Sequence, residues 1–212
     1  MKFLEDIDFA FPKTLAEALK LMADEKNCGR PVAGGTDLMV QWTSGVLQMP
    51  ERAIDISGLP ELKGISETAD ALVIGAAATH AEIRRSQLVK THLPSLAQAA
   101  ATIGGAQIQA RGTIAGSVAN ASPAGDLGPS LLITNGRAVV ASKSGEREIE
   151  LTKFFLGYRK IDLNPDELIV RFGLPKIHQG CRESFRKLGP RAAQAISKVM
   201  GSYRGSAKGK EV

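Results

Sequence analysis

One stretch of small residues, from Arg111 to Pro129, constrains this chain more than any other part of its sequence. The segment RGTIAGSVANASPAGDLGP has four glycines and two prolines among its 19 residues, and its only charged residues are Arg111 and Asp126. Where side chains are this small, backbone N–H groups can approach a ligand closely. We interpret the stretch as the central loop of a binding site, with one carboxylate, Asp126, available as a hydrogen-bond acceptor.

A second turn of the same character lies near the N-terminus, in PVAGGTDLMV from Pro31 to Val40. Gly34 and Gly35 are adjacent, and a hydroxyl and a carboxylate follow at Thr36 and Asp37. Because backbone amides in such turns form concave anion sites, the two turns together predict a ligand with a diphosphate and several hydroxyls. The alternative is that each turn only reverses the chain. The Gly-x-Gly-x-x-Gly and P-loop fingerprints are absent from the sequence.

The rest of the chain mixes helical and extended patterns in irregular order, which indicates the α+β class. Capping boxes at Thr14–Glu17 and Thr79–Glu82 predict helix starts, and short apolar runs predict buried strands. We expect helices at 15–25, 37–42, 79–86, 94–103 and 128–132, strands at 31–33, 53–56, 72–78 and 168–174, and a hairpin formed by 137–141 and 147–150.

Composition favours a cytoplasmic protein without a membrane span. No apolar run approaches the roughly 18 residues that a spanning helix needs, and the N-terminal segment MKFLEDIDFAF carries acids where a signal peptide would be apolar. Two cysteines, Cys28 and Cys181, lie far apart, and too few thiols are present for an iron–sulfur cluster, which takes about four. The three histidines have no partners at metal-ligand spacing, so no metal site is predicted.

Positive charge is concentrated at the C-terminal end. Residues 182–212 carry eight Lys or Arg against two Glu, so this segment accounts for +6 of a chain whose net charge is +5. A basic segment can bind nucleic acid. Beyond Phe185, however, its only aromatic residue is Tyr203, so base stacking has little support. We interpret the segment as a solvated or partner-facing end rather than a nucleic-acid site.

Five motifs in order carry a resemblance to a known family. They are AGGTDL (33–38), IGAAATHAEI (74–83), RGTIAGSVANASPAGD (111–126), FFLGYRKIDLNPDELIV (154–170) and FRKLGPRAAQAI (185–196). Together they resemble the FAD-binding medium subunit of the molybdenum hydroxylases, which include xanthine dehydrogenases, carbon monoxide dehydrogenases and aldehyde oxidoreductases. The resemblance runs from about residue 1 to about residue 200.

The resemblance implies the two-lobed FAD-binding fold of the vanillyl-alcohol-oxidase (PCMH) type. It places the small lobe at 1–57, the large lobe at 58–175 and the start of a truncated C-terminal domain at 176–200, and we expect a disordered tail at 201–212. It also implies which residues bind FAD. These are Val32, Ala33, Gly34, Gly35, Thr36, Asp37, Ile103, Thr113, Ile114, Ala115, Gly116, Ser117, Asn120, Ser122, Asp126, Ile169 and Lys187.

Roles follow from the same resemblance. The residues of 32–37 and 113–117 would wrap the diphosphate with amides and hydroxyls, and Asp126 would accept hydrogen bonds from cofactor hydroxyls. Ile103 and Ile169 would contact the flavin ring, and Lys187 would lie near it, where a cation stabilises the reduced ring. The alternatives are a helix cap for Asp126, plain core for the isoleucines and a solvated Lys187.

Two departures from the family pattern are visible. Gln109-Ala110 replaces the usual Arg-Asn, and Ala115-Gly116-Ser117 replaces Gly-Gly-Asn. Ala115 keeps its N–H but narrows the available backbone conformations, whereas Ser117 loses an amide side chain.

The resemblance implies an oxidoreductase subunit without a catalytic residue of its own. FAD would relay electrons from iron–sulfur clusters to NAD, a quinone or oxygen. The molybdenum cofactor and the 2Fe–2S clusters would belong to a large and a small partner subunit, in a heterotrimer or a dimer of heterotrimers. Two alternatives stay open: a stand-alone FAD oxidoreductase of the same fold, such as a UDP-sugar reductase, and a truncated, non-catalytic scaffold.

Overall fold

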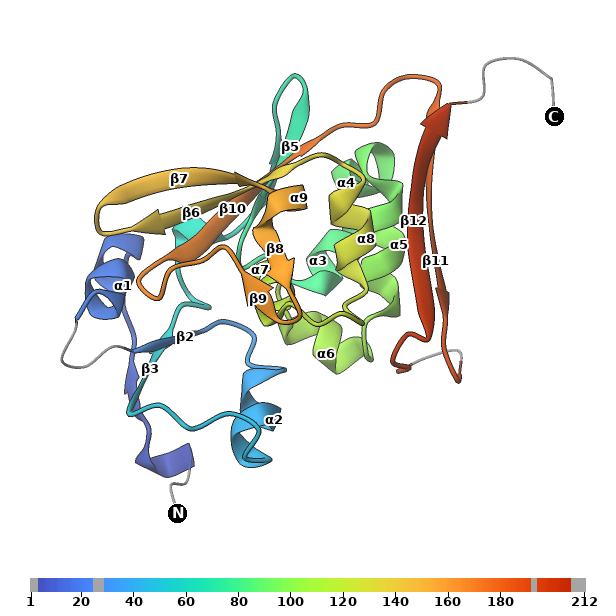
Figure 1. The fold of residues 1–212 in the computed structure, drawn as a ribbon. Helices are drawn as coiled ribbons and strands as arrows, with labels where there is room; N and C mark the ends of the chain where they lie inside the picture. Colours follow the sequence, from blue (N-terminus) through green and yellow to red (C-terminus); the bar gives the residue numbers. More distant parts are fainter. Residues whose placement is uncertain (1–3, 25–28, 192–193, 207–212) are drawn as a thin grey trace.

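A computed structural model describes residues 4–24, 29–191 and 194–206. Its N-terminal part contains a small parallel sheet with strand order β1-β3-β2. Figure 1 shows this sheet in blue and cyan, with α2 beside it and α1 between it and the larger sheet. The elements of this part are η1 (Leu4–Asp6), β1 (Asp8–Ala10), α1 (Leu15–Met22), β2 (Arg30–Val32), α2 (Leu38–Thr43), β3 (Arg52–Asp55) and η2 (Pro60–Leu62).

A five-stranded antiparallel sheet with order β4-β5-β10-β6-β7 forms the centre of the molecule. The long central strand β10 is buried at most positions, as the apolar run LIVRFGLP predicts. The expected hairpin is present as β6 and β7, joined by the turn Lys143-Ser144; the next residue, Gly145, has a φ of +131°. The strands are β4 (Ile65–Glu67), β5 (Ala71–Gly75), β6 (Arg137–Ser142), β7 (Gly145–Glu150) and β10 (Leu168–Pro175).

Short helices cover one face of this sheet (Figure 1). Thr79 accepts from the amide of Glu82 while Glu82 accepts from Thr79, so the predicted capping box starts α3. The helices are α3 (His80–Arg85), α4 (Gln87–His92), α5 (Pro94–Thr102), α6 (Ala106–Arg111), α7 (Ile114–Asn120) and α8 (Leu127–Leu132). Of these, α4, α6 and α7 were not predicted.

The central stretch is therefore not a continuous loop. Thr113 caps α7 by accepting from the amide of Gly116, and the helix ends at Ala121, whose φ of +45° is left-handed. Isolated helices this short are unstable in water, and packing supplies most helical stability in proteins. Ile114 is fully buried and Val118 nearly so. The helix thus depends on tertiary contacts, which the small-residue composition alone could not indicate.

One large hydrophobic core joins the two sheets. Leu19 of α1 and Ile54 of β3 belong to the same buried cluster as Ile74 of β5, Leu96 of α5 and Phe172 of β10. A smaller cluster lies around Trp42 of α2. The small sheet spans 8–55 and the large one 65–175, while the domain boundaries themselves remain a prediction.

The C-terminal elements form an antiparallel hairpin of β11 (Cys181–Leu188) and β12 (Val199–Ser206). Figure 1 shows it beyond α5 and α8, on the side of these helices away from the large sheet. The expectation of disorder is wrong for 201–206, because these residues pair with 181–186. The remaining tail, 207–212, lies outside the described residues. The connecting elements are α9 (Leu151–Phe154), β8 (Phe155–Gly157) and β9 (Lys160–Ile161).

Two negative findings, on membrane-spanning helices and on metal sites, apply to the described residues only. Among them, no helix is both long and apolar enough to cross a membrane. Within the same residues, no group of three or more His, Cys, Asp or Glu side chains could hold a metal ion. Cys181 is a free, partly exposed thiol, and Cys28 lies outside the described residues.

Candidate cofactor site

The first glycine turn follows β2 and leads into α2. Val32 is buried at the strand end, and Gly35 has a φ of +72°, a backbone conformation that favours glycine. No described residue accepts a hydrogen bond from the amide N–H groups of 33–36, all of which lie in partly exposed residues. Because buried or half-buried amides are normally paired, four successive unpaired donors are suited to an anionic ligand.

In the second turn, unlike the first, the backbone amides donate to protein acceptors. Those of Ile114 and Ala115 donate to the carbonyls of Ala78 and Ala76, at 3.0 and 3.2 Å, and that of Ser117 donates to the Thr113 carbonyl. With Gly116 bonded to the Thr113 hydroxyl at 3.1 Å, all four amides from 114 to 117 have protein acceptors. The amides of Ile114 and Ala115 thus join α7 to the segment between β5 and α3, and those of Gly116 and Ser117 bond to its own N-cap residue. Contact of 113–117 with a diphosphate stays a prediction.

The two turns nevertheless meet. A Cβ on Gly34 would lie 2.0 Å from the carbonyl oxygen of Arg111, so only glycine allows this approach of the two backbones. Side chains connect the same elements: Gln41 Nε2 donates to Asn120 Oδ1, and Asn120 Nδ2 donates to Asp37 Oδ1, both at 3.0 Å. The structure thus brings together two segments that lie about 80 residues apart in the sequence.

The Asp37 carboxylate is perturbed by this packing. Desolvation by the surrounding protein raises the pKa of Asp37, and the nearby charge of Arg159 opposes that rise. Arg159 lies in the turn between β8 and β9, with a left-handed φ of +52°. The first glycine turn therefore has a cation nearby, which no local sequence pattern indicates.

Asp126 lies at the start of α8, but its side chain makes no capping hydrogen bond. The helix-cap alternative is therefore wrong. Instead Lys187 Nζ lies 2.6 Å from Asp126 Oδ2, and Thr102 Oγ1 donates to the same oxygen at 3.1 Å. Ser197 Oγ donates to Oδ1 at 2.7 Å. The Asp126 and Lys187 side chains are 6% and 11% exposed, so the solvated alternative for Lys187 is also wrong.

His80 packs next to this cluster. Its ring carbon Cδ2 and nitrogen Nε2 would both lie 3.0 Å from a Cβ on Gly112, so the imidazole supports the backbone of the second turn. Burial lowers the pKa of His80 to about 4, and the nearby Asp126 charge opposes this shift. The imidazole is therefore neutral at pH 7, and its buried Nδ1 has no hydrogen-bond partner among the described residues.

The remaining predicted residues are less closely associated with the two turns. Ile103 is the C-cap of α5 and is partly buried, whereas Ile169 of β10 is 2% exposed and lies within the main core. The Ser122 hydroxyl accepts from the amide of Ala124 within its own turn. Contact of these three residues with a cofactor stays a prediction.

Several residues that shape the site were missed by sequence reasoning. Thr102 and Ser197 bind Asp126, and Gln41 binds Asn120. Gln109, at the departure from the family pattern, is buried and donates to the carbonyls of Ala101 and Ile103 at the end of α5. No spacing signal identifies any of them, because each contacts a partner from another element or turn.

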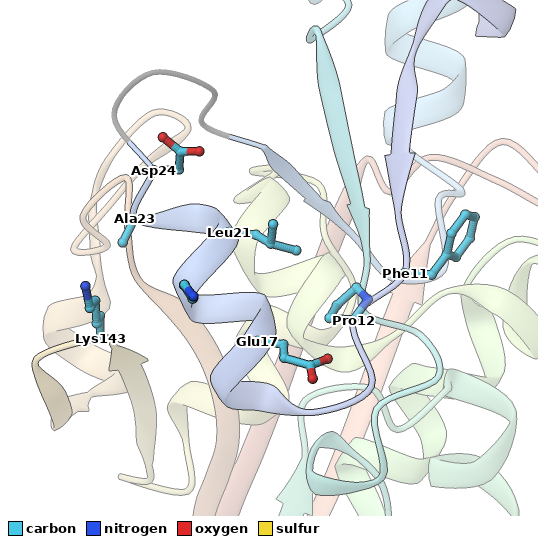
Figure 2. Close-up of a pocket in the computed structure, with 8 residues that line it drawn as sticks. Phe11, Pro12, Glu17, Leu21, Ala23, Asp24 and Lys143 are labelled. Carbon is cyan, nitrogen blue, oxygen red and sulfur yellow. The ribbon is translucent and has the colours of Figure 1, made fainter.

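An open cavity of about 560 Å³ lies elsewhere, alongside α1, and is lined by residues of the segment 11–24 and by Lys143 from the turn of the β6–β7 hairpin. Figure 2 shows Phe11 and Pro12 on one side of α1 and Lys143 on the other, with Leu21 projecting from the helix. None of the residues predicted to bind the cofactor lines this cavity. It is therefore separate from the site formed by the two turns.

Comparison with known proteins matches the chain to one family, described as "FAD binding domain in molybdopterin dehydrogenase", over residues 5–177. The carbon monoxide dehydrogenase medium chain of Hydrogenophaga pseudoflava is 32% identical over 85% of this chain and 63% of its own length. The xanthine dehydrogenase FAD-binding subunit of Escherichia coli O157:H7 is 33% identical over 76% of this chain and 55% of its own. The chain therefore spans about six tenths of the length of these curated relatives.

Comparison with solved structures gives the same result as the sequence comparison. Quinoline 2-oxidoreductase from Pseudomonas putida 86 superposes with a TM-score of 0.91 at 26% identity, over 99% of this chain and 71% of the other. A carbon monoxide dehydrogenase from Hydrogenophaga pseudoflava, which lacks the Mo-pyranopterin moiety, gives 0.86 at 30% identity, over 90% and 66%. These matches confirm the fold class and the resemblance drawn from the five motifs.

Proposed function

Because the chain belongs to the family of FAD-binding domains of molybdopterin dehydrogenases, we propose that it binds FAD as the medium subunit of a molybdenum-containing hydroxylase or dehydrogenase. The observation that carries this proposal is the meeting of the two glycine turns within the matched region. Gly34 contacts Arg111 there, and the amides of 33–36 have no acceptor among the described residues.

The residues present fit such a cofactor. The unpaired amides of the first turn suit a diphosphate, since backbone N–H groups bind phosphate oxygens without any side chain. The Asp126–Lys187 pair offers an acceptor and a donor for neutral polar groups such as sugar or ribityl hydroxyls. When bound, FAD supplies the electron transfer that links iron–sulfur clusters to an acceptor such as NAD, a quinone or oxygen. The chain's own residues bind and orient it.

The partners follow from the same family. Relatives are named as a medium chain and as an FAD-binding subunit. By analogy, this chain would associate with a molybdopterin-binding large subunit and a 2Fe–2S small subunit, and oxidoreductase activity would belong to the whole complex in the cytoplasm. A stand-alone flavoprotein would instead need its own substrate-binding residues, for which the sequence offers no cluster.

The absorption spectrum of the purified chain near 450 nm tests FAD binding directly. We expect a bound flavin, released by heat and identified by chromatography as FAD. FMN, or a colourless chain that FAD does not restore, would refute the proposal. Molybdenum and iron co-purifying with the chain would support the complex, and their absence from a flavin-containing preparation would favour the stand-alone alternative.

A matched pair of glycine variants tests the site. Gly34→Ala places a Cβ 2.0 Å from the Arg111 carbonyl oxygen, whereas Gly58→Ala places one in open space with no atom within 4 Å. We expect Gly34→Ala to lose at least about tenfold in FAD affinity, equal to about 1.4 kcal/mol. Gly58→Ala should bind as the unchanged chain does. Equal affinities in the two variants would contradict a site formed where the turns meet.

A further inference from the structure

The β11–β12 hairpin lies outside the part of the chain that the family description matches, which ends at residue 177. It nevertheless provides two of the three groups that bind Asp126: Lys187 from β11 and Ser197 from the segment that returns to β12. The third, Thr102, comes from the last turn of α5. The environment of Asp126 is therefore completed by an element outside the matched domain.

The Asp126–Lys187 pair still has hydrogen-bonding groups that no contact among the described residues uses. Lys187 has three N–H donors, and two of them bind Asp126 Oδ2 and the Thr102 carbonyl. Asp126 Oδ2 already accepts from Lys187 and Thr102, whereas Oδ1 accepts from Ser197 alone. One donor and one acceptor position stay unused, on oppositely charged groups 2.6 Å apart.

We propose that Ser197 and Thr102 are positioning residues, which orient Asp126 and Lys187 so that the unused acceptor and donor bind neutral polar groups of the flavin. This inference rests on the proposed function. Each hydroxyl contacts one carboxylate oxygen. Ser197 donates to Oδ1 from the hairpin at 2.7 Å. Thr102 lies 3.1 Å from Oδ2, and its single proton is shared between that oxygen and the Ala99 carbonyl at 2.8 Å. Without them the carboxylate can rotate about its Cβ–Cγ bond, since that torsion is soft.

A simpler role is that these contacts only dock the hairpin. Its docking surface is rich in polar contacts: Ser202 Oγ lies 2.7 Å from Ser130 Oγ, Gln98 accepts from the amide of Phe185 at 2.8 Å, and Ser95 donates to Glu183. Because Ser202 and Ser197 are both partly buried hairpin serines with one hydroxyl contact to the helical layer, Ser202→Ala is a matched control for Ser197→Ala.

The experiment measures FAD dissociation constants for the full chain and for Ser197→Ala, Thr102→Val and Ser202→Ala by quenching of flavin fluorescence. We expect Ser197→Ala and Thr102→Val to weaken FAD binding about fivefold or more, since each removes a hydrogen bond to a charged group. Ser202→Ala should bind as the unchanged chain does, and Ser197→Thr, which keeps the hydroxyl, should restore affinity.

Two further readouts separate positioning from docking. The visible spectrum and reduction potential of the bound flavin should change in Ser197→Ala and not in Ser202→Ala, because only the former changes the orientation of the charged groups beside the cofactor. In a chain that also carries Asp126→Ala and Lys187→Met, Ser197→Ala should have no additional effect on affinity. Equal effects of Ser197→Ala and Ser202→Ala, or none from either, would overturn the inference while leaving FAD binding intact. An unchanged chain that binds no FAD would instead refute the proposed function, and this inference with it.

Discussion

Removing one partner of the Asp126–Lys187 pair should destabilise the protein far more than removing both. The two charged groups lie 2.6 Å apart with side chains 6% and 11% exposed, so either one left alone would be a nearly buried, unpaired charge. Breaking a buried pair in this way costs about 3–5 kcal/mol. We therefore expect Asp126→Ala to lower the free energy of unfolding by about that amount, because Lys187 would lose its carboxylate partner and the Ser197 hydroxyl its acceptor.

The double variant Asp126→Ala/Lys187→Met should recover most of this loss, because no unpaired charge remains. The Arg171–Glu146 pair is an exposed control at the same 2.6 Å separation, with side chains 42% and 44% exposed. Exposed pairs contribute about 0–1 kcal/mol, so Arg171→Met should be nearly neutral. The comparison isolates burial as the cause, since distance and charge are matched.

Urea unfolding followed by circular dichroism measures these free energies, and thermal melts check them. For a chain of this size, about 1 kcal/mol corresponds to about 2–4 °C in Tm, so Asp126→Ala should melt on the order of 6–20 °C lower. All samples should be free of flavin, because bound ligand adds to stability. A loss of only about 1 kcal/mol in Asp126→Ala, similar to that in Arg171→Met, would refute the reasoning.

Three further predictions concern other parts of the fold. The pKa of His80 is about 4 in the folded chain, against an ordinary value of 6.5, so as the pH falls the unfolded chain is protonated at a higher pH than the folded chain. The free energy of unfolding should therefore decrease by up to about 3 kcal/mol as the pH drops from 6.5 to 4. In urea titrations, His80→Gln should reduce that decrease. Gln109→Ala leaves two α5 carbonyls without their donor and should cost about 1–3 kcal/mol, whereas exposed Gln107→Ala should stay within about 0.5 kcal/mol. Ala121 has a left-handed φ of +45°, a conformation that glycine adopts with less strain. Ala121→Gly should therefore increase the free energy of unfolding by about 0.5–1 kcal/mol, which thermal melts would detect as a higher melting temperature.

Much of the fold could be predicted because its signals are local. The capping boxes that start α1 and α3 satisfy helix-end donors with side chains three residues away, so adjacent sequence contains the whole interaction. The β6–β7 hairpin is equally local, with a two-residue turn at Lys143-Ser144. By contrast, the local sequence predicts a loop where α7 lies, because a seven-residue helix depends on tertiary packing that no local pattern indicates.

The glycine pairs and the family motifs by themselves determined the fold class, the family and the FAD-binding expectation, because residue types in order along the chain carry that information. Tertiary structure alone decided how these residues interact. In the folded chain the amides of 114–117 donate to protein acceptors, whereas those of 33–36 have no acceptor among the described residues. Asp126 pairs with Lys187 and accepts a hydrogen bond from Ser197, which lie 61 and 71 positions away in the sequence. The physical reason is that the energy of a buried charge depends on which donors surround it in space, and the chain brings those donors from α5 and from the β11–β12 hairpin only when it folds.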